Sequence, residues 1–200
     1  MVESERSEVK REMRVTDDRY RGEQARFDLA MRMISHEART GTIRYWTGLS
    51  DDRIRKLYAS YFKYEGRPVR RRRGRSPTQI GPLVCSPLRA LESGMLANLL
   101  VANRLLRVDG EAQPRLERNV GFGHRFCESY ETYMTLVIQP VLNFEWGWNL
   151  LLSIRRGDEL GLERCDNCLR GYVVDLLALP RNRCPVCSML IEIRSGEPIH

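Results

Sequence analysis

The sequence contains no apolar segment long enough to cross a membrane. Its longest apolar candidate, residues 95–102, is short and is interrupted by Asn98, whereas a bilayer-spanning helix needs about 18 or more apolar residues. The residues after Met1 are Val-Glu-Ser-Glu-Arg, so the apolar core of a secretion signal is missing as well. We therefore expect a soluble, cytoplasmic protein that keeps its thiols reduced and does not contact a membrane.

Histidine is scarce, and the motifs of common enzyme classes are missing. The three histidines are His36, His124 and His200. His36-Glu37 is followed by Ala-Arg-Thr, so the second histidine of an HExxH zinc-protease motif is lacking. The stretch Leu-Glu-Ser-Gly at residues 91–94 lacks the first glycine of a nucleophile elbow, and no glycine-rich phosphate loop occurs. The sequence thus predicts no catalytic residues and a protein that is not an enzyme.

Four of the six cysteines are grouped near the C-terminus. They form two CxxC hooks, Cys165-Asp-Asn-Cys168 and Cys184-Pro-Val-Cys187, separated by 15 residues. Two such hooks can close a tetrahedron of thiolates around Zn²⁺ at Zn–S distances of about 2.3 Å. Four protein sulfurs leave no open position for water or substrate, so we expect one structural zinc ion per chain. Two disulfides are the alternative, which a reducing compartment disfavours.

The residues around the hooks fit a zinc ribbon. Gly171 would permit the turn after the first hook. The β-forming residues 172–177 and a turn over residues 179–182 predict a small hairpin between the hooks. Cys85 and Cys127 have no partner at ligand spacing, and we expect both to be semi-buried thiols. Four arginines would favour the thiolate form of the ligands: Arg164, Arg170, Arg181 and Arg183.

The chain is basic, with a formal net charge of +7. Glycine, proline and serine surround its densest basic segment, which predicts an exposed arm over residues 66–78. A solvated loop is the simpler interpretation, but mutual repulsion among the arginines favours a polyanionic partner such as a nucleic acid backbone. The arm carries six arginines within nine residues: Arg67, Arg70, Arg71, Arg72, Arg73 and Arg75.

Hydrophobic periodicity predicts a mainly helical chain. We expect a flexible lead-in over residues 1–20, a helical domain over residues 21–157, and the zinc ribbon over residues 158–200. The first helix would run from Glu23 to Gly41, and later ones would cover residues 124–138 and 141–156. Ser50 is the predicted N-cap of the second helix and Ser86-Pro87 the start of the third. The predicted apolar stripe of the third helix is Leu88, Leu91, Met95, Leu99 and Leu106.

Residues 38–62 have the spacing of a helix-turn-helix unit, whose second helix can enter the major groove of DNA. Arg44 stands where this motif usually has a small residue, and many two-helix corners share the pattern. Arg53, Arg55 and Lys56 would point outward, where they could bond guanine edges or phosphates. The apolar and glycine positions of the motif are Ile43, Gly48, Leu49, Ile54 and Leu57.

The chain resembles the FlhC family of flagellar master transcriptional regulators over roughly residues 23–190. The resemblance rests on Asp28-Leu-Ala-Met-Arg-Met-Ile34, Ala38-Arg39, Gly48-Leu-Ser-Asp-Asp-Arg-Ile-Arg-Lys-Leu-Tyr58 and Gly74-Arg-Ser-Pro77. A long helix and a tryptophan-bearing helix then lead into the paired CxxC hooks. Each motif alone is generic, whereas their order and separation together are specific.

The resemblance implies a mainly helical, DNA-binding transcriptional activator that works in a hetero-oligomer with an FlhD-type subunit. RNA polymerase is a further candidate partner. It also implies that the cysteine quartet holds zinc. The arginine arm is denser than the family implies, so we expect it to contribute to DNA affinity. Two alternatives remain open from the residues: a zinc-ribbon factor associated with RNA or the ribosome, and a non-catalytic adaptor.

Overall fold

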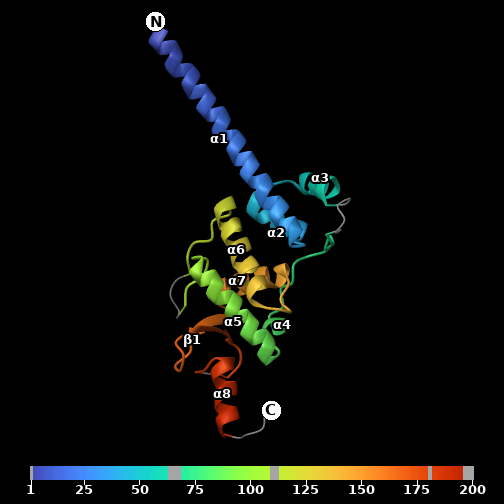
Figure 1. The fold of residues 1–200 in the computed structure, drawn as a ribbon, viewed down its shortest axis with the longest axis vertical. Coiled ribbons are helices and arrows are strands. Elements are labelled where there is room, and N and C mark those ends of the chain that lie inside the picture. Colours follow the sequence, from blue (N-terminus) through green and yellow to red (C-terminus); the bar gives the residue numbers. More distant parts are fainter. Residues whose placement is uncertain (1, 63–68, 109–112, 180–181, 196–200) are drawn as a thin grey trace.

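The computed structural model describes residues 2–62, 69–108, 113–179 and 182–195, which form a mainly helical fold with one two-stranded sheet (Figure 1). This confirms the predicted fold class. The elements are α1 (Val2–Ser35), α2 (Thr40–Thr47), α3 (Asp51–Tyr61), α4 (Gly81–Val84), α5 (Pro87–Ala102), α6 (Val120–Leu136), α7 (Phe144–Arg156), β1 (Leu160–Arg164), β2 (Gly171–Asp175) and α8 (Pro185–Ser195).

Helix α1 begins at Val2, so the predicted start at Glu23 was wrong. Glu, Arg, Lys and Met are good helix formers, and they carry the helix through a segment that has few apolar positions. Its N-terminal part projects away from the body of the molecule, and α8 lies at the opposite end of the molecule (Figure 1). The predicted end at Gly41 was also wrong, because α1 ends at Ser35 and Gly41 lies within α2.

Serine and asparagine caps start most of the other helices. The side chains of Ser50 and Ser86 accept hydrogen bonds from the backbone N–H groups of Arg53 and Arg89, as the sequence predicted for α3 and α5. Asn119 caps α6, and an asparagine caps α7 in the same way. Side-chain oxygens thus satisfy N–H groups that a helix start leaves without partners.

Aromatic rings fill the centre of the body, where α2, α6 and α7 meet. Trp46 and Trp148 lie 5.2 Å apart between ring centroids, and Phe126 and Phe144 lie 5.0 Å apart, both pairs in edge-to-face geometry. All four side chains are buried. Such pairs are favourable beyond the area that they bury, because ring edges carry positive and ring faces negative partial charge.

The buried face of α5 differs from the predicted one. Leu96, Ala97 and Leu100 are fully buried, whereas Leu88 is exposed and the middle of the predicted stripe is only partly covered. Glu92 is also buried, where its carboxylate accepts hydrogen bonds from the Tyr133 hydroxyl and a backbone N–H group. The buried face of α5 thus contains a carboxylate, so it does not coincide with the stripe that was predicted from apolar residues alone.

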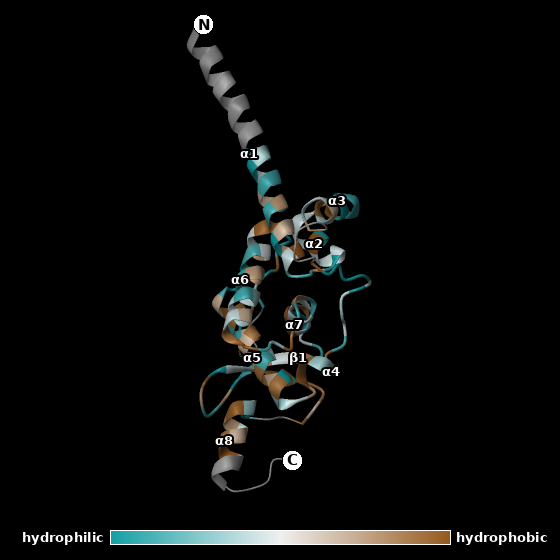
Figure 2. Ribbon diagram, turned by 45° about the vertical axis from the view of Figure 1, so that its right-hand side comes forward, coloured by the Kyte–Doolittle hydropathy of each residue, from teal (hydrophilic) through white to brown (hydrophobic). Residues whose placement is uncertain are grey.

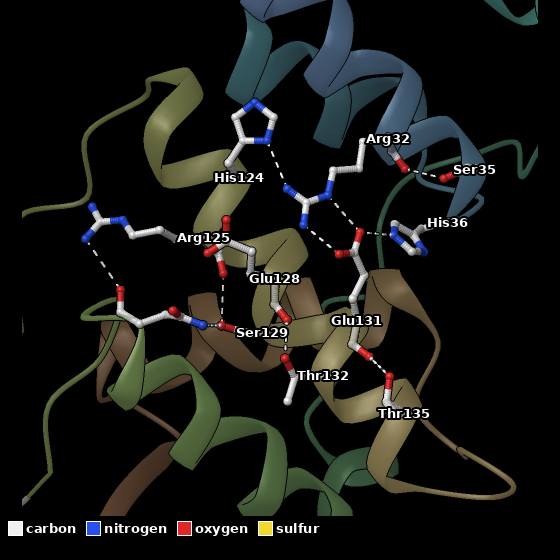
Figure 3. A network of polar contacts seen from close by, with 11 residues as sticks. Arg32, Ser35, His36, His124, Arg125, Glu128, Ser129, Glu131, Thr132 and Thr135 are labelled. Atoms are coloured by element: carbon white, nitrogen blue, oxygen red, sulfur yellow. Dashed lines mark hydrogen bonds and ion pairs between the residues drawn. The ribbon is translucent and has the colours of Figure 1, made fainter.

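An ionic cluster joins α1 to α6 (Figure 3). The Arg32 guanidinium donates two hydrogen bonds to the Glu131 carboxylate, at 2.7 and 2.5 Å. The His36 ring nitrogen lies 2.8 Å from the same carboxylate, and Arg32 also contacts His124 at 3.0 Å. His36 and His124 therefore both contribute to the contact between the C-terminal end of α1 and α6.

Strands β1 and β2 form an antiparallel hairpin that packs against α5. The register pairs Leu160 with Asp175 and Arg164 with Gly171. Leu160, Leu162 and Val173 belong to the main hydrophobic core. The strands of the C-terminal unit thus share the hydrophobic core of the helical body. Among the described residues, none of the helices combines the length and the apolar composition that crossing a bilayer requires.

Candidate metal centre and nucleic-acid interface

The first hook lies in the turn of the β1–β2 hairpin. Cys165 follows β1 directly, and its N–H group donates to the Arg170 carbonyl at 2.9 Å. Leu169 donates back to the Cys165 carbonyl at 2.8 Å and has a φ of 61°. Leu169 thus adopts the left-handed conformation that closes this turn, and the prediction that Gly171 provides it was wrong.

Gly171 instead lets the hairpin approach α5 closely. A Cβ atom at this position would lie 3.0 Å from the Asn98 side-chain oxygen. The Asn98 amide donates to the Gly171 carbonyl at 2.6 Å and to a carbonyl of its own helix at 2.7 Å. The hairpin therefore attaches to the helical body at the residue where β2 begins.

The second hook opens a helix, whereas the sequence predicted a hairpin bounded by both hooks. Cys184 directly precedes α8, and Cys187 lies in its first turn. The N–H group of Cys187 donates to the Cys184 sulfur at 3.5 Å. The positive end of the helix dipole favours thiolates at this place. The predicted turn at residues 179–182 lies partly outside the described residues.

The four sulfur atoms come together at one point. All four Sγ atoms lie within 4.8 Å of one another, and those of Cys168 and Cys184 are 3.7 Å apart. A tetrahedral site with metal–sulfur bonds of about 2.3 Å needs sulfur separations of about 3.8 Å. Three of these cysteines are buried, and Cys168 is partly exposed. The quartet Cys165, Cys168, Cys184 and Cys187 could therefore hold a metal ion.

Hydrogen bonds favour the thiolate at one ligand. Burial would raise the pKa of Cys165, but backbone N–H groups of Cys184, Cys168 and Asn167 outweigh it and lower the pKa to about 6. Burial raises the pKa of Cys184 to about 12, with further contributions from the other thiols. Four sulfurs at this distance cannot all ionise without a cation, so the cluster has the chemistry of a metal site.

One polar side chain of this centre was not predicted from the sequence. The Asn167 amide, inside the first hook, donates to the Cys187 sulfur of the second hook at 3.2 Å. Only the fold shows this contact, because the two residues are 20 positions apart. The predicted arginines Arg164, Arg170 and Arg183 are exposed, and Arg181 lies outside the described residues.

The other thiols lie away from this centre. Cys127 is fully buried, and burial raises its pKa to about 12. Cys85 is exposed. The prediction that both are semi-buried was therefore wrong.

Helices α2 and α3 form the corner that the sequence predicted for residues 38–62. The turn between them is Gly48-Leu49-Ser50, and Gly48 has a φ of 69°, which glycine adopts without strain. Each predicted apolar position is buried: Ile43, Leu49, Ile54 and Leu57. Arg44 points to the surface and pairs with Asp51 at 3.3 Å, so it does not crowd the turn.

The outer face of α3 is polar and exposed. Arg53 pairs with Glu23 of α1 at 3.6 Å, and Arg55 pairs with Asp52 at 3.1 Å. Lys56 is exposed on the same helix. Exposed ion pairs of this kind contribute about 0–1 kcal/mol, so a stronger anionic partner could displace them.

The described part of the arm runs from the level of α3 toward α4 as a hydrophilic segment along one side of the molecule (Figure 2). At its first described residue, the Val69 carbonyl accepts a hydrogen bond from the Tyr58 hydroxyl of α3. Further along, the Ser76 hydroxyl donates to the buried Glu145 carboxylate of α7. The arm is thus attached at two places to the elements beside the α2–α3 corner.

Between these attachments the arginines differ in their surroundings. Arg72 lies 2.8 Å from the Glu37 carboxylate and is partly buried, so it helps to attach the arm. Arg67 lies outside the described residues. The remaining arginines of the arm are exposed: Arg70, Arg71, Arg73 and Arg75. Of these, Arg70 and Arg71 lie beside residues of the α2–α3 corner, among them Ile54 and Tyr58 of α3.

No protein-family model matches this chain, and no curated protein matches it either. The described residues contain two candidate sites: the four-sulfur centre, and the α2–α3 corner with the neighbouring basic arm.

Proposed function

We propose that this protein is a DNA-binding transcriptional activator of flagellar genes that acts with an FlhD-type partner subunit. The α2–α3 corner carries the proposal, because its second helix presents Arg53, Arg55 and Lys56 beside exposed arginines of the arm. In a helix-turn-helix the second helix reads base edges, while neighbouring basic residues contact phosphates.

We also propose that the four-sulfur centre binds zinc and serves structure only. Thiolates are preferred ligands of Zn²⁺, and four of them complete its usual tetrahedral coordination. The bound ion would join the hairpin turn to the start of α8. These two parts bury few apolar side chains against each other apart from the cysteines and Tyr172.

Mobility shifts on flagellar promoter fragments, with and without the FlhD-type subunit, test the DNA-binding function. We expect a sequence-selective shift that single-stranded RNA at matched salt does not abolish. A preference for single-stranded RNA would instead favour an RNA-associated factor. The absence of any selective shift, with or without the partner, would contradict the proposal.

Two groups of substitutions separate phosphate contacts from base readout. Replacing Arg70, Arg71 and Arg73 with alanine should weaken binding to all DNA sequences alike and reduce its salt dependence. This variant keeps Arg72, which attaches the arm through Glu37. Replacing Arg55 or Lys56 should alter sequence preference. If the arm variant lost only sequence preference, the proposed division of roles would be wrong.

Metal analysis tests the zinc proposal. We expect one zinc ion per chain in the purified, reduced protein and less than this in Cys165→Ser and Cys187→Ser variants. A protein without a tightly bound divalent ion, whose fold persists in strong chelator, would contradict a structural metal.

A further inference from the structure

A cleft with a volume of about 510 Å³ lies where α1, the α2–α3 corner and the start of α6 meet. Three arginines from separate parts of the chain line it: Arg26 of α1, Arg44 of α2, and Arg118 just before α6. None of the described residues that line this cleft is acidic. The cleft therefore concentrates positive charge in a concave site, and this charge favours an anionic ligand.

The fold holds one of these arginines in position. The Arg118 guanidinium lies over the Tyr45 ring, 4.7 Å from its centroid. Tyr45 in turn packs against Trp46 and Trp148, with centroid distances of 5.1 and 4.9 Å. An arginine stacked on an anchored ring loses less side-chain freedom when it binds a phosphate.

Arg44 has a carboxylate neighbour outside the cleft lining. Its guanidinium pairs with Asp51 at 3.3 Å, and its side chain is 61% exposed. Such an exposed pair is weak, so Arg44 can also bond an anion in the cleft. Asp51 offsets part of the positive charge, and so does Glu117, whose carboxylate accepts a hydrogen bond from the Asn119 amide at 2.8 Å. Arg26 and Arg118 are therefore the principal cations.

The N-terminus of α6 adds hydrogen-bond donors to the cleft. Asn119 and Val120 line it, and they are the cap and the first residue of this 17-residue helix. The Asn119 side chain accepts from the N–H group of Phe122 at 3.0 Å. The N–H group of Asn119 donates to the Glu117 carbonyl at 2.9 Å, so the donors that this helix start can offer an anion are those of Val120 and Gly121. They lie at the positive end of the helix dipole. Cations and N–H donors together suit a phosphate group.

The cleft lies beside the start of α3. Gly48, in the turn that leads to α3, forms part of its wall, and Arg44 contacts Asp51 in the first turn of α3. The arm contacts the same helix near its other end, where Tyr58 bonds to the Val69 carbonyl. A helix in the major groove has phosphate backbones on both sides. The cleft and the arm thus add positive charge near the two ends of α3, where arginines can reach backbone phosphates.

We propose that this cleft binds a phosphate group of the DNA backbone beside α3. The inference rests on the proposed DNA-binding function, and it adds a second phosphate contact to the one expected from the arm. Arg26 and Arg118 would bond the phosphate oxygens, and the start of α6 would donate from its backbone.

The test compares Arg26→Gln, Arg118→Gln and the double variant with a matched control, Arg104→Gln, which removes an exposed arginine outside the cleft and the arm. Duplex DNA binding is measured by fluorescence anisotropy over a range of salt concentrations, and inorganic phosphate binding by phosphorus NMR. Circular dichroism and metal content verify folding. Arg118→Lys keeps the charge and provides a second variant.

We expect each glutamine variant to weaken DNA binding on the order of fivefold, and the double variant to reduce the log–log salt slope by about one. Phosphate binding should weaken in parallel, while Arg104→Gln matches the wild type and Arg118→Lys keeps most of the salt slope. Wild-type DNA affinity and slope in the double variant would overturn the inference alone. Loss of phosphate binding with unchanged DNA binding would assign the cleft to a free anion, such as a nucleotide, and also overturn it. Failure of the wild type to bind DNA would instead refute the proposed function.

Discussion

At the scale of single residues, the polar contacts that matter most join distant parts of the chain. Glu131 bonds Arg32 of α1 and His36, which directly follows α1. Asn167 bonds the sulfur of Cys187 across the two hooks. Neither contact has a sequence signature, because each depends on how the elements pack, whereas residue spacing alone identified the four cysteines that could hold a metal ion.

Glu131 should make stability depend on acid pH. Hydrogen bonds from Arg32, opposed by burial and assisted by His36, lower the pKa of this carboxyl to about 2. A carboxyl with a lowered pKa in the folded state stabilises it above the unfolded-state value of about 4.3, and this contribution disappears as pH falls toward 2. We expect Glu131→Gln to destabilise the protein by about 1–2 kcal/mol at pH 7, after allowance for solvent screening. The difference from the wild type should shrink between about pH 5 and pH 2.

Urea unfolding at several pH values measures this effect. Glu128→Gln, which changes an exposed glutamate on the same helix, is the matched control and should show little change. A constant difference between Glu131→Gln and the wild type across this pH range would show that ionisation of Glu131 is not the cause.

Asn167 should strengthen metal binding although it is not a ligand. Its amide donates to the Cys187 sulfur at 3.2 Å, which stabilises the thiolate. We expect Asn167→Ala to weaken metal affinity on the order of tenfold. Competition with a chromophoric chelator measures the change. The control is Asn182→Ala, which changes an exposed asparagine two residues before Cys184. Equal affinity in Asn167→Ala and the wild type would count against this role.

At the scale of elements, close packing between helices decides which glycines can be replaced by alanine without loss of stability. Gly123 lies where α6 meets α1 and α2, and a Cβ atom there would approach Leu29 Cδ2 to 2.4 Å and Trp46 Cβ to 3.3 Å. Gly121 is exposed on the same helix, and the nearest atom to a Cβ there is the Asn119 side-chain oxygen at 3.4 Å. The two glycines therefore form a matched pair.

We expect Gly123→Ala to destabilise the protein by about 1–3 kcal/mol because of overpacking. Gly121→Ala should be neutral or stabilising by up to about 1 kcal/mol, since alanine favours the helix. Thermal and chemical unfolding of both variants test this pair. If Gly123→Ala were as stable as Gly121→Ala, the described packing of α6 against α1 and α2 would be incorrect.

At the scale of the whole molecule, the C-terminal unit depends on two sources of stability. The hairpin strands share the main core through Leu160, Leu162 and Val173. The turn of the first hook and the start of α8 instead meet at the four sulfurs. Metal removal should therefore loosen only part of the unit.

Hydrogen exchange before and after chelation measures this difference. We expect faster exchange over residues 165–170 and 184–191, with little change in α5, α6 and α7. Exchange at β1 and β2 should change less than at the hooks, because these strands pack on α5. Global unfolding on chelation, or no change at the hooks, would each contradict this arrangement.

The sequence by itself determined the mainly helical class, the α2–α3 corner with its Ser50 cap, the start of α5 and the four clustered cysteines. Each of these follows from spacing along the chain, which local geometry converts directly into structure. The tertiary structure alone decided the buried face of α5, the conformation of the first hook, the attachment of the arm through Arg72 and the arginine cleft. These features depend on contacts between residues far apart in sequence, where burial and charge compensation outweigh local preference.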